Sequence, residues 1–132
     1  MQYGNVMKNP LDSSILFVDF EYACLNYQSY DIANHFFEYT CHYKDDDYII
    51  NFDDFPNFTE RARFYRFYSK EFDDPAEDSR LVQYDGQVMA MLKISHLFWS
   101  IWGFIMAVQP TSPTFPYLSY AKDRFDFFLQ HQ

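Results

Sequence analysis

Glycine is scarce in this sequence, with only three in 132 residues. Loops that cradle phosphate groups need closely spaced glycines, because the backbone N–H groups must approach the phosphate without a Cβ in between. The sequence has no such loop motif, and it shows no trio of nucleophile, base and acid. Any phosphate binding that depends on a glycine-rich loop must therefore come from outside these residues.

Cysteine and positive charge are also limited. Cys24 and Cys41 are the two cysteines, and the absence of C-x-x-C spacing favours free buried thiols in a reducing, cytoplasmic compartment over a disulfide. Ten Lys and Arg stand against 19 Asp and Glu, which gives a net charge of −9. Nucleic acids and anionic membranes bind basic surfaces, so we expect neither as a partner, whereas a small cation remains compatible.

The sequence has no internal repeat, no low-complexity segment and no signal-peptide pattern in Met1–Pro10. Its most apolar stretch, Leu97–Val108, is twelve residues long. A helix that spans a bilayer needs about 20 apolar residues. We therefore expect a buried core helix at this stretch and no membrane span.

Apolar residues make up 48% of the chain and aromatic residues 23%, which is enough for one hydrophobic core in a single domain. Short β-branched and aromatic runs predict strands near the N-terminus, and apolar periodicity predicts helices in the rest. The predicted fold class is mainly α with a short N-terminal β-hairpin. The predicted strands are Val6–Lys8 and Ile15–Val18, and the predicted helices are Ile32–His42, one that begins at Thr59, Ser79–Gln109 with an interruption or bend near Gly86, and Tyr117–Gln130.

Two aspartates stand at the ends of predicted elements. Asp19 follows the strand Ile15–Val18, where a carboxylate points into a crevice and can hold a metal ion. Asp31 precedes the helix Ile32–His42, and its side chain can accept the free N–H groups of the first turn as an N-cap. The chemistry is therefore expected around residues 17–43.

A long motif in this region closely resembles the signature of choline/ethanolamine kinases. The matching segments are Asp19-Phe20-Glu21-Tyr22, Asn26-Tyr27 and Tyr30-Asp31-Ile32-Ala33-Asn34-His35-Phe36-Phe37-Glu38. The motif mixes rare residue types at fixed spacing, so chance is a poor explanation. The resemblance implies that residues 1–132 form the helical C-terminal lobe of a protein-kinase-like fold, beginning inside the catalytic loop and without the lobe that grips ATP.

The same resemblance assigns the catalytic side of the site. Gln2-Tyr3-Gly4-Asn5-Val6 is similar to the second half of the family's catalytic loop, H-x-D-x-x-x-G-N, although an ordinary polar N-terminus is the alternative. Asn5 and Asp19 would then hold Mg²⁺ that bridges the phosphates of ATP, Glu21 would support a second ion, and Gln2 would lie beside the substrate hydroxyl.

A cluster of aromatic residues is the expected substrate site. Trp99 and Trp102 share one helical face, and plain core packing is the alternative for such a pair. The resemblance instead assigns them to a cage for the substrate's ammonium group. A quaternary ammonium has no hydrogen-bond donor and binds aromatic faces at about 0.5–2 kcal/mol each. The expected cage residues are Glu38, Tyr43, Trp99, Trp102 and Tyr120.

Other groups of polar residues are weaker candidates for a functional site. His35, Glu38, Cys41 and His42 contain zinc-ligand types, but their spacing matches no closed four-ligand pattern. The acidic stretch Asp45–Asp54 is expected to be a solvent-facing excursion. By resemblance, Asp31, Asn34 and His35 are structural: Asp31 caps its helix and braces the catalytic loop, and His35 is a hydrogen-bonding core residue.

The resemblance implies ATP-dependent phosphorylation of the hydroxyl of choline or ethanolamine, for phospholipid head-group synthesis, by a larger enzyme that can be a homodimer. We expect this chain alone to be inactive. The alternative is a non-catalytic, kinase-derived module that binds a quaternary ammonium or a protein partner. A primary ammonium needs hydrogen-bond acceptors, whereas a trimethylammonium needs apolar faces. The aromatic lining therefore predicts choline over ethanolamine.

Overall fold

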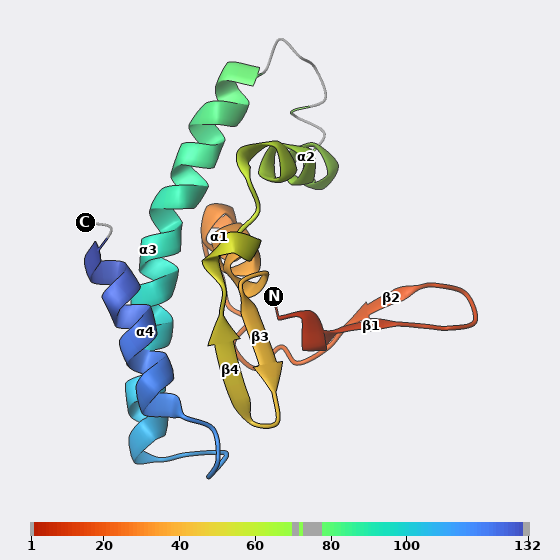
Figure 1. The fold of residues 1–132 in the computed structure, drawn as a ribbon. Coiled ribbons are helices and arrows are strands. Elements are labelled where there is room, and N and C mark those ends of the chain that lie inside the picture. Colours follow the sequence, from red (N-terminus) through yellow and green to blue (C-terminus); the bar gives the residue numbers. More distant parts are fainter. Residues whose placement is uncertain (1, 70–71, 73–77, 131–132) are drawn as a thin grey trace.

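The computed structural model describes residues 2–69, 72 and 78–130, and it is mainly helical (Figure 1). Strands β1 (Val6–Lys8) and β2 (Ile15–Phe17) follow a short 3-10 turn, η1 (Tyr3–Asn5), and form the predicted antiparallel hairpin, with Val6 opposite Phe17. The remaining elements are α1 (Gln28–Glu38), β3 (Cys41–Lys44), β4 (Asp47–Ile50), η2 (Phe52–Asp54), α2 (Phe58–Tyr68), α3 (Asp78–Val108) and α4 (Tyr117–Gln130). The expected fold class is confirmed.

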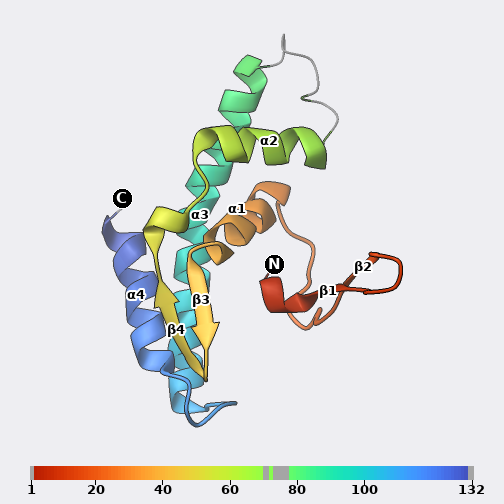
Figure 2. The same cartoon turned by 45° about the vertical axis from the view of Figure 1, so that its right-hand side comes forward.

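Helix α3 is the longest helix, and α1 and α4 both pack against it (Figures 1 and 2). Helices α3 and α4 approach closely at Gly103, where an added Cβ would lie 3.0 Å from the Cβ of Ala121. A glycine suits this contact, because any larger residue would require the backbone of α4 at Ala121 to shift. This contact fixes how α4 lies along the end of α3 that carries the tryptophans.

The main core lies between α1, α2 and the first half of α3. Its buried members come mostly from these helices, and aromatic rings fill much of the volume. The core consists of Ile32, Ala33, Phe36, Phe37, Cys41, Ala62, Tyr65, Phe72, Leu81, Val88 and Leu92. The signature helix is thus held on its apolar face by the rest of the domain.

The boundaries predicted for the signature helix are wrong. Helix α1 begins at Gln28 and ends at Glu38, its N-cap is Tyr27, and no side chain caps it. Asp31 lies inside the first turn, so the predicted N-cap role is wrong, although its charge still suits the positive end of the helix dipole.

The acidic stretch after α1 is a second β-hairpin, which the sequence interpretation missed. Strands β3 and β4 pair antiparallel, with Lys44 opposite Asp47. Asp45 and Asp46 between them have φ angles of 52° and 60°. Positive φ at both central residues is the conformation of the tight turn that best matches the twist of two strands, and Asp tolerates it.

Three other local predictions need correction. Helix α2 begins at Phe58 rather than at Thr59, and its N-cap, Asn57, forms a capping box with Glu60. Helix α3 runs through Gly86 without interruption, since one glycine costs a helix only about 1 kcal/mol. Cys24 is exposed rather than buried, while both cysteines are free as expected.

The apolar half of α3 is only partly buried. Phe98, Ile101 and Ile105 are about half exposed, so the prediction of a segment buried all round is wrong. Among the described residues, α3 is the one helix with the length and apolar composition to cross a membrane, and 33% of its apolar window is buried. Side chains on its other face pack against α1 and α4, as a core helix requires.

Candidate functional site

The two tryptophans of α3 form the centre of the candidate site. Their ring centroids lie 5.4 Å apart at 75°, an edge-to-face pair. Tyr120 of α4 meets Trp102 at 6.1 Å and 83°, and Tyr120 is only 4% exposed. Edge-to-face contacts of this kind fix the rings relative to one another. Residues from two helices that are separated in sequence thus form one aromatic group.

Glu38 and Tyr43 reach the same place from the end of α1 and from β3. Burial raises the pKa of Tyr43 strongly, and the nearby Tyr120 and Glu38 raise it further. Burial likewise raises the pKa of Tyr120 to about 12, although Arg124 acts in the opposite direction. The structure therefore brings all five predicted cage residues together, with Tyr43 on strand β3, which follows α1.

Glu38 is a half-buried residue with one buried carboxylate oxygen that lacks a hydrogen-bond partner among the described residues. Burial raises the pKa of its carboxyl, while the Arg124 charge and a hydrogen bond with Tyr43 oppose the rise. Its Oε2 atom is buried and has no hydrogen-bond partner among the described residues. A buried carboxylate oxygen without a partner is unfavourable unless a cation or donor arrives. Chemically, the arrangement suits a small cation held among aromatic rings.

Tyr22 is a member of this group that sequence reasoning missed. Its hydroxyl accepts a hydrogen bond from Nε1 of Trp102 at 2.8 Å. Its ring also meets Trp99 edge-on at 5.6 Å. The available signal was its place in the D-F-E-Y motif beside Asp19, which links the aromatic group to the acidic segment.

The predicted catalytic and metal residues lie on the N-terminal hairpin. Nδ2 of Asn5 donates to Oδ2 of Asp19 at 3.4 Å, and the Val18 N–H donates to the Asn5 carbonyl at 3.0 Å. Asp19 has a φ of 62°, a left-handed conformation that Asp tolerates better than most residues. Asn5 and Asp19 are thus brought together, as the sequence predicts.

An amide oxygen and a carboxylate suit Mg²⁺, which prefers oxygen ligands. The Gln2 carbonyl accepts from the Asn5 N–H at 3.1 Å, which places Gln2 beside the pair. Glu21 lies in an exposed turn of the next segment. Within residues 2–69, 72 and 78–130, no three His, Cys, Asp or Glu side chains gather as a metal site, which leaves the zinc alternative without support.

The three residues expected to be structural differ in surroundings. Oδ1 of Asn34 accepts hydrogen bonds from Ser95 and Trp99. His35 packs against the rings of Tyr39 and Phe64, each at 5.4 Å. Asp31 is exposed on the first turn of α1. Asn34 is therefore the one of these residues that touches the candidate site.

Comparison with known proteins gives a consistent result over nearly the whole chain. The family model described as choline/ethanolamine kinase matches residues 1–129. A probable choline kinase of Arabidopsis thaliana is 34% identical over 127 residues, covering 96% of this chain and 36% of the relative. The human choline/ethanolamine kinase is 32% identical over 148 aligned positions, covering the whole chain and 36% of the relative.

A solved structure agrees with these sequences. The crystal structure of a choline kinase from Cryptosporidium parvum Iowa II superposes with a TM-score of 0.77 at 25% identity, over 98% of this chain and 36% of that one. The chain thus spans about a third of the length of the relatives it matches. Over that span, the matched signature and the shared architecture show that this chain belongs to the choline/ethanolamine kinase family.

Proposed function

We propose that this chain is the helical C-terminal part of a cytoplasmic kinase that transfers the γ-phosphoryl group of ATP to the hydroxyl of choline, with ethanolamine as the poorer substrate. The observation that carries the proposal is the Glu38 carboxylate beside the rings of Tyr43 and Tyr120, since its Oε2 atom is buried and has no hydrogen-bond partner among the described residues. A trimethylammonium offers charge without hydrogen-bond donors, so aromatic faces and one nearby acid are its natural partners.

Each half of the site has a distinct task in this proposal. Trp99, Trp102 and their aromatic neighbours hold the ammonium group and exclude water from it. Gln2 lies beside the hydroxyl, and Asn5 with Asp19 supplies oxygen ligands for Mg²⁺. A bound Mg²⁺ would neutralise charge on the phosphates of ATP. The phosphocholine product would serve phospholipid head-group synthesis.

The catalytic base and the ATP-gripping lobe are expected in the two thirds of the relatives that this chain does not span. Loss of a general base alone lowers a rate by about 10²- to 10⁴-fold. We therefore expect binding of choline by the 132-residue chain, without choline-dependent release of ADP. A non-catalytic ammonium-binding module is the second candidate, because the cage residues all belong to this chain.

Calorimetric titration with choline and with ethanolamine tests the proposed binding. Choline is expected to bind more tightly, and Trp102→Ala is expected to weaken it by about 2- to 30-fold, the equivalent of one aromatic face. Phe67→Ala removes an exposed ring on α2 and serves as the control. No choline binding by a folded chain, or equal loss in both variants, would contradict the cage.

A chimera separates the two candidates. This chain replaces the matched third of a complete relative, and ADP release is followed with each alcohol. Choline-dependent turnover supports the kinase, whereas choline binding without turnover in the chimera supports the module. A preference for ethanolamine would contradict the assigned substrate.

A further inference from the structure

Asn34 has an unusual position for a residue of the signature helix. Its Oδ1 accepts from the Ser95 hydroxyl at 2.8 Å and from Nε1 of Trp99 at 2.7 Å. A carbonyl oxygen has two lone pairs, so these two bonds use both of them. One side-chain oxygen of α1 thus binds two residues of α3, and one of these is a cage tryptophan.

The direction of these hydrogen bonds is set by Trp99. Its indole N–H can only donate, so Asn34 presents its oxygen, not its NH₂ group, to Trp99, and the Ser95 hydroxyl donates to the same oxygen. Arg124 of α4 extends this arrangement: its guanidinium is fully buried, lies 3.8 Å over the Phe37 ring, and donates from Nη2 to Oγ of Ser95 at 3.3 Å.

We propose that Asn34 is a positioning residue that sets the plane of the Trp99 indole in the cage, through a hydrogen-bond chain from Arg124 by way of Ser95. The inference deepens the proposed function and rests on it for its catalytic meaning. Trp102 is held differently, since its Nε1 donates to the Tyr22 hydroxyl at 2.8 Å. The two indoles thus donate to two separate acceptors, while their rings stay in edge-to-face contact.

The chain offers a closely matched pair of serines for the test. Ser95 and Ser100 are both fully buried on α3. Ser95 bonds to Asn34, whereas Oγ of Ser100 has no hydrogen-bond partner within the part of the chain that the structure describes. Removing either hydroxyl leaves a similar small cavity, but only Ser95→Ala breaks the chain to Trp99.

The experiment records the indole N–H signals of the two tryptophans by ¹⁵N–¹H NMR on the 132-residue chain, assigned with Trp99→Phe. Asn34→Leu removes the acceptor at similar size and is expected to shift the Trp99 signal and speed its hydrogen exchange. Asn34→Asp keeps an acceptor oxygen, so it is expected to preserve the position of the Trp99 signal and its rate of hydrogen exchange. Ser95→Ala is expected to shift the Trp99 signal less than Asn34→Leu, and Ser100→Ala to leave it in place. The Trp102 signal is expected to shift less than the Trp99 signal in each variant, because its own acceptor, Tyr22, is unaltered.

Choline titration of the same variants supplies the functional readout. Asn34→Leu is expected to weaken choline by about 3- to 10-fold, the fold-change of one hydrogen bond, with Asn34→Asp restoring affinity. An unchanged Trp99 signal in Asn34→Leu, or equal shifts in Ser95→Ala and Ser100→Ala, would overturn the positioning role. If Asn34→Leu does not fold, the comparison of the Trp99 signal in Ser95→Ala and Ser100→Ala tests the positioning role. Absence of choline binding by the unaltered chain would overturn the proposed function instead, while the NMR signals still decide the role of Asn34.

Discussion

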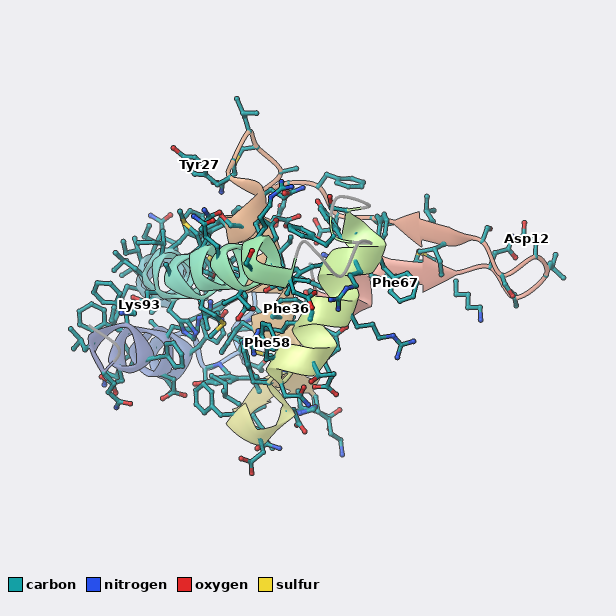
Figure 3. The ribbon with its side chains drawn as sticks, turned by 90° about the horizontal axis from the view of Figure 1, so that it is seen from above. Asp12, Tyr27, Phe36, Phe58, Phe67 and Lys93 are labelled. Atoms are coloured by element: carbon teal, nitrogen blue, oxygen red, sulfur yellow. The ribbon has the colours of Figure 1, made fainter. Side chains whose placement is uncertain are left out.

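The aromatic cage and the N-terminal hairpin β1–β2 are supported by this chain in very different ways. The cage is built from α1, β3, α3 and α4, and its members lie against a packed interior, with Tyr120 only 4% exposed. The hairpin β1–β2 carries Asn5 and Asp19 at its base and projects from the helices, with Asp12 near its far end (Figures 1 and 3).

The exposed fractions show the same contrast. Ile15, Leu16 and Phe17 of β2 are 53%, 61% and 47% exposed, so both faces of this short strand are open. Burial of such side chains stabilises by about 1.5–3 kcal/mol each, and the hairpin obtains little of this. The cage is therefore organised by the chain's own core, whereas the hairpin gains little stabilisation from that core.

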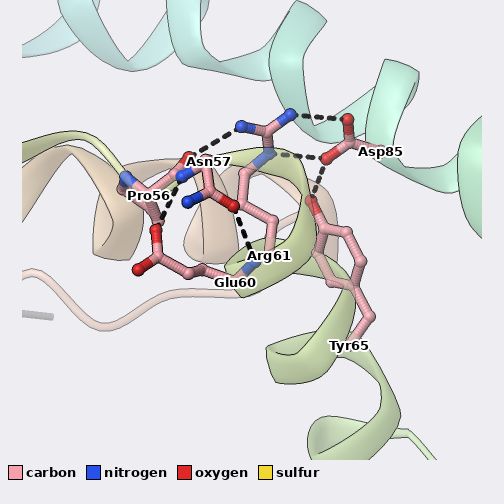
Figure 4. A network of polar contacts seen from close by, with 6 residues as sticks. All are labelled: Pro56, Asn57, Glu60, Arg61, Tyr65 and Asp85. Atoms are coloured by element: carbon pink, nitrogen blue, oxygen red, sulfur yellow. Dashed lines mark hydrogen bonds and ion pairs between the residues drawn. The ribbon is translucent and has the colours of Figure 1, made fainter.

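The largest effect is expected at the ion pair that joins α2 to α3 (Figure 4). Arg61 binds both carboxylate oxygens of Asp85 at 2.8 Å, and the Tyr65 hydroxyl donates to the same carboxylate at 2.7 Å. Asp85→Ala leaves a largely buried guanidinium without its partner and is expected to lower the free energy of unfolding by about 3–5 kcal/mol. Urea denaturation measures this.

The control for Asp85→Ala is the exposed pair of Arg66 and Asp78, whose side chains are 39% and 63% exposed. Asp78→Ala is expected to change stability by less than about 1 kcal/mol. Similar losses at the two sites would show that the helical body does not depend on its buried network, and the contrast with the hairpin would weaken.

The second effect tests the close contact of α3 and α4 beneath the cage. Gly103→Ala places a Cβ 3.0 Å from that of Ala121 and is expected to destabilise by about 1–3 kcal/mol while it pushes Tyr120 away from Trp102. Gly86→Ala meets no atom within 4 Å and is expected to stabilise by about 0.5–1 kcal/mol. Thermal unfolding measures the change in stability of both variants, which is expected to have opposite signs.

The third effect is a pH dependence of the cage at Glu38. Its pKa is raised above the ordinary value of 4.5, chiefly by burial. The folded chain thus holds this proton more tightly than the unfolded chain, so its stabilising contribution is present below pH 4.5 and is lost as the pH rises through the folded pKa. Glu38→Gln is expected to remove this fall in stability at neutral pH and to weaken choline binding.

Unfolding curves at a series of pH values, with and without choline, measure the effect of Glu38→Gln. Choline is expected to restore stability to the unaltered chain at neutral pH, since a bound cation balances the buried carboxylate. If Glu38→Gln shows the same dependence of stability on pH as the unaltered chain, a group other than Glu38 causes the fall in stability.

The smallest effect is expected on the hairpin. Asp19→Asn keeps a residue that tolerates the positive φ but removes the charge. Stability and choline affinity are expected to stay within about 0.5 kcal/mol, because Asp19 is exposed and lies outside the core. A large loss of stability would mean that the hairpin is part of the folded body after all, and the contrast drawn between the two regions would fail.

The sequence by itself determined the helical class and the first hairpin, and the family resemblance predicted the five residues that the fold brings together. The apolar periodicity of α4 and the β-branched runs of β1 and β2 are local signals, and the signature motif supplied what local patterns cannot. The ends of α1 were missed because Asp31 is equally suited to an N-cap and to a first turn, so only the backbone distinguishes them.

The tertiary structure alone decided what surrounds those residues. The Asp45–Asp46 turn places Tyr43 on a strand. Tyr22 reaches Trp102 from the N-terminal part of the chain, and Arg124 reaches Ser95 from the C-terminal part. Such contacts join residues far apart in sequence, and they depend on how helices pack rather than on any local preference. For the same reason only the fold showed that one face of α3 is exposed, since an apolar segment looks identical in sequence whether or not a neighbour covers it.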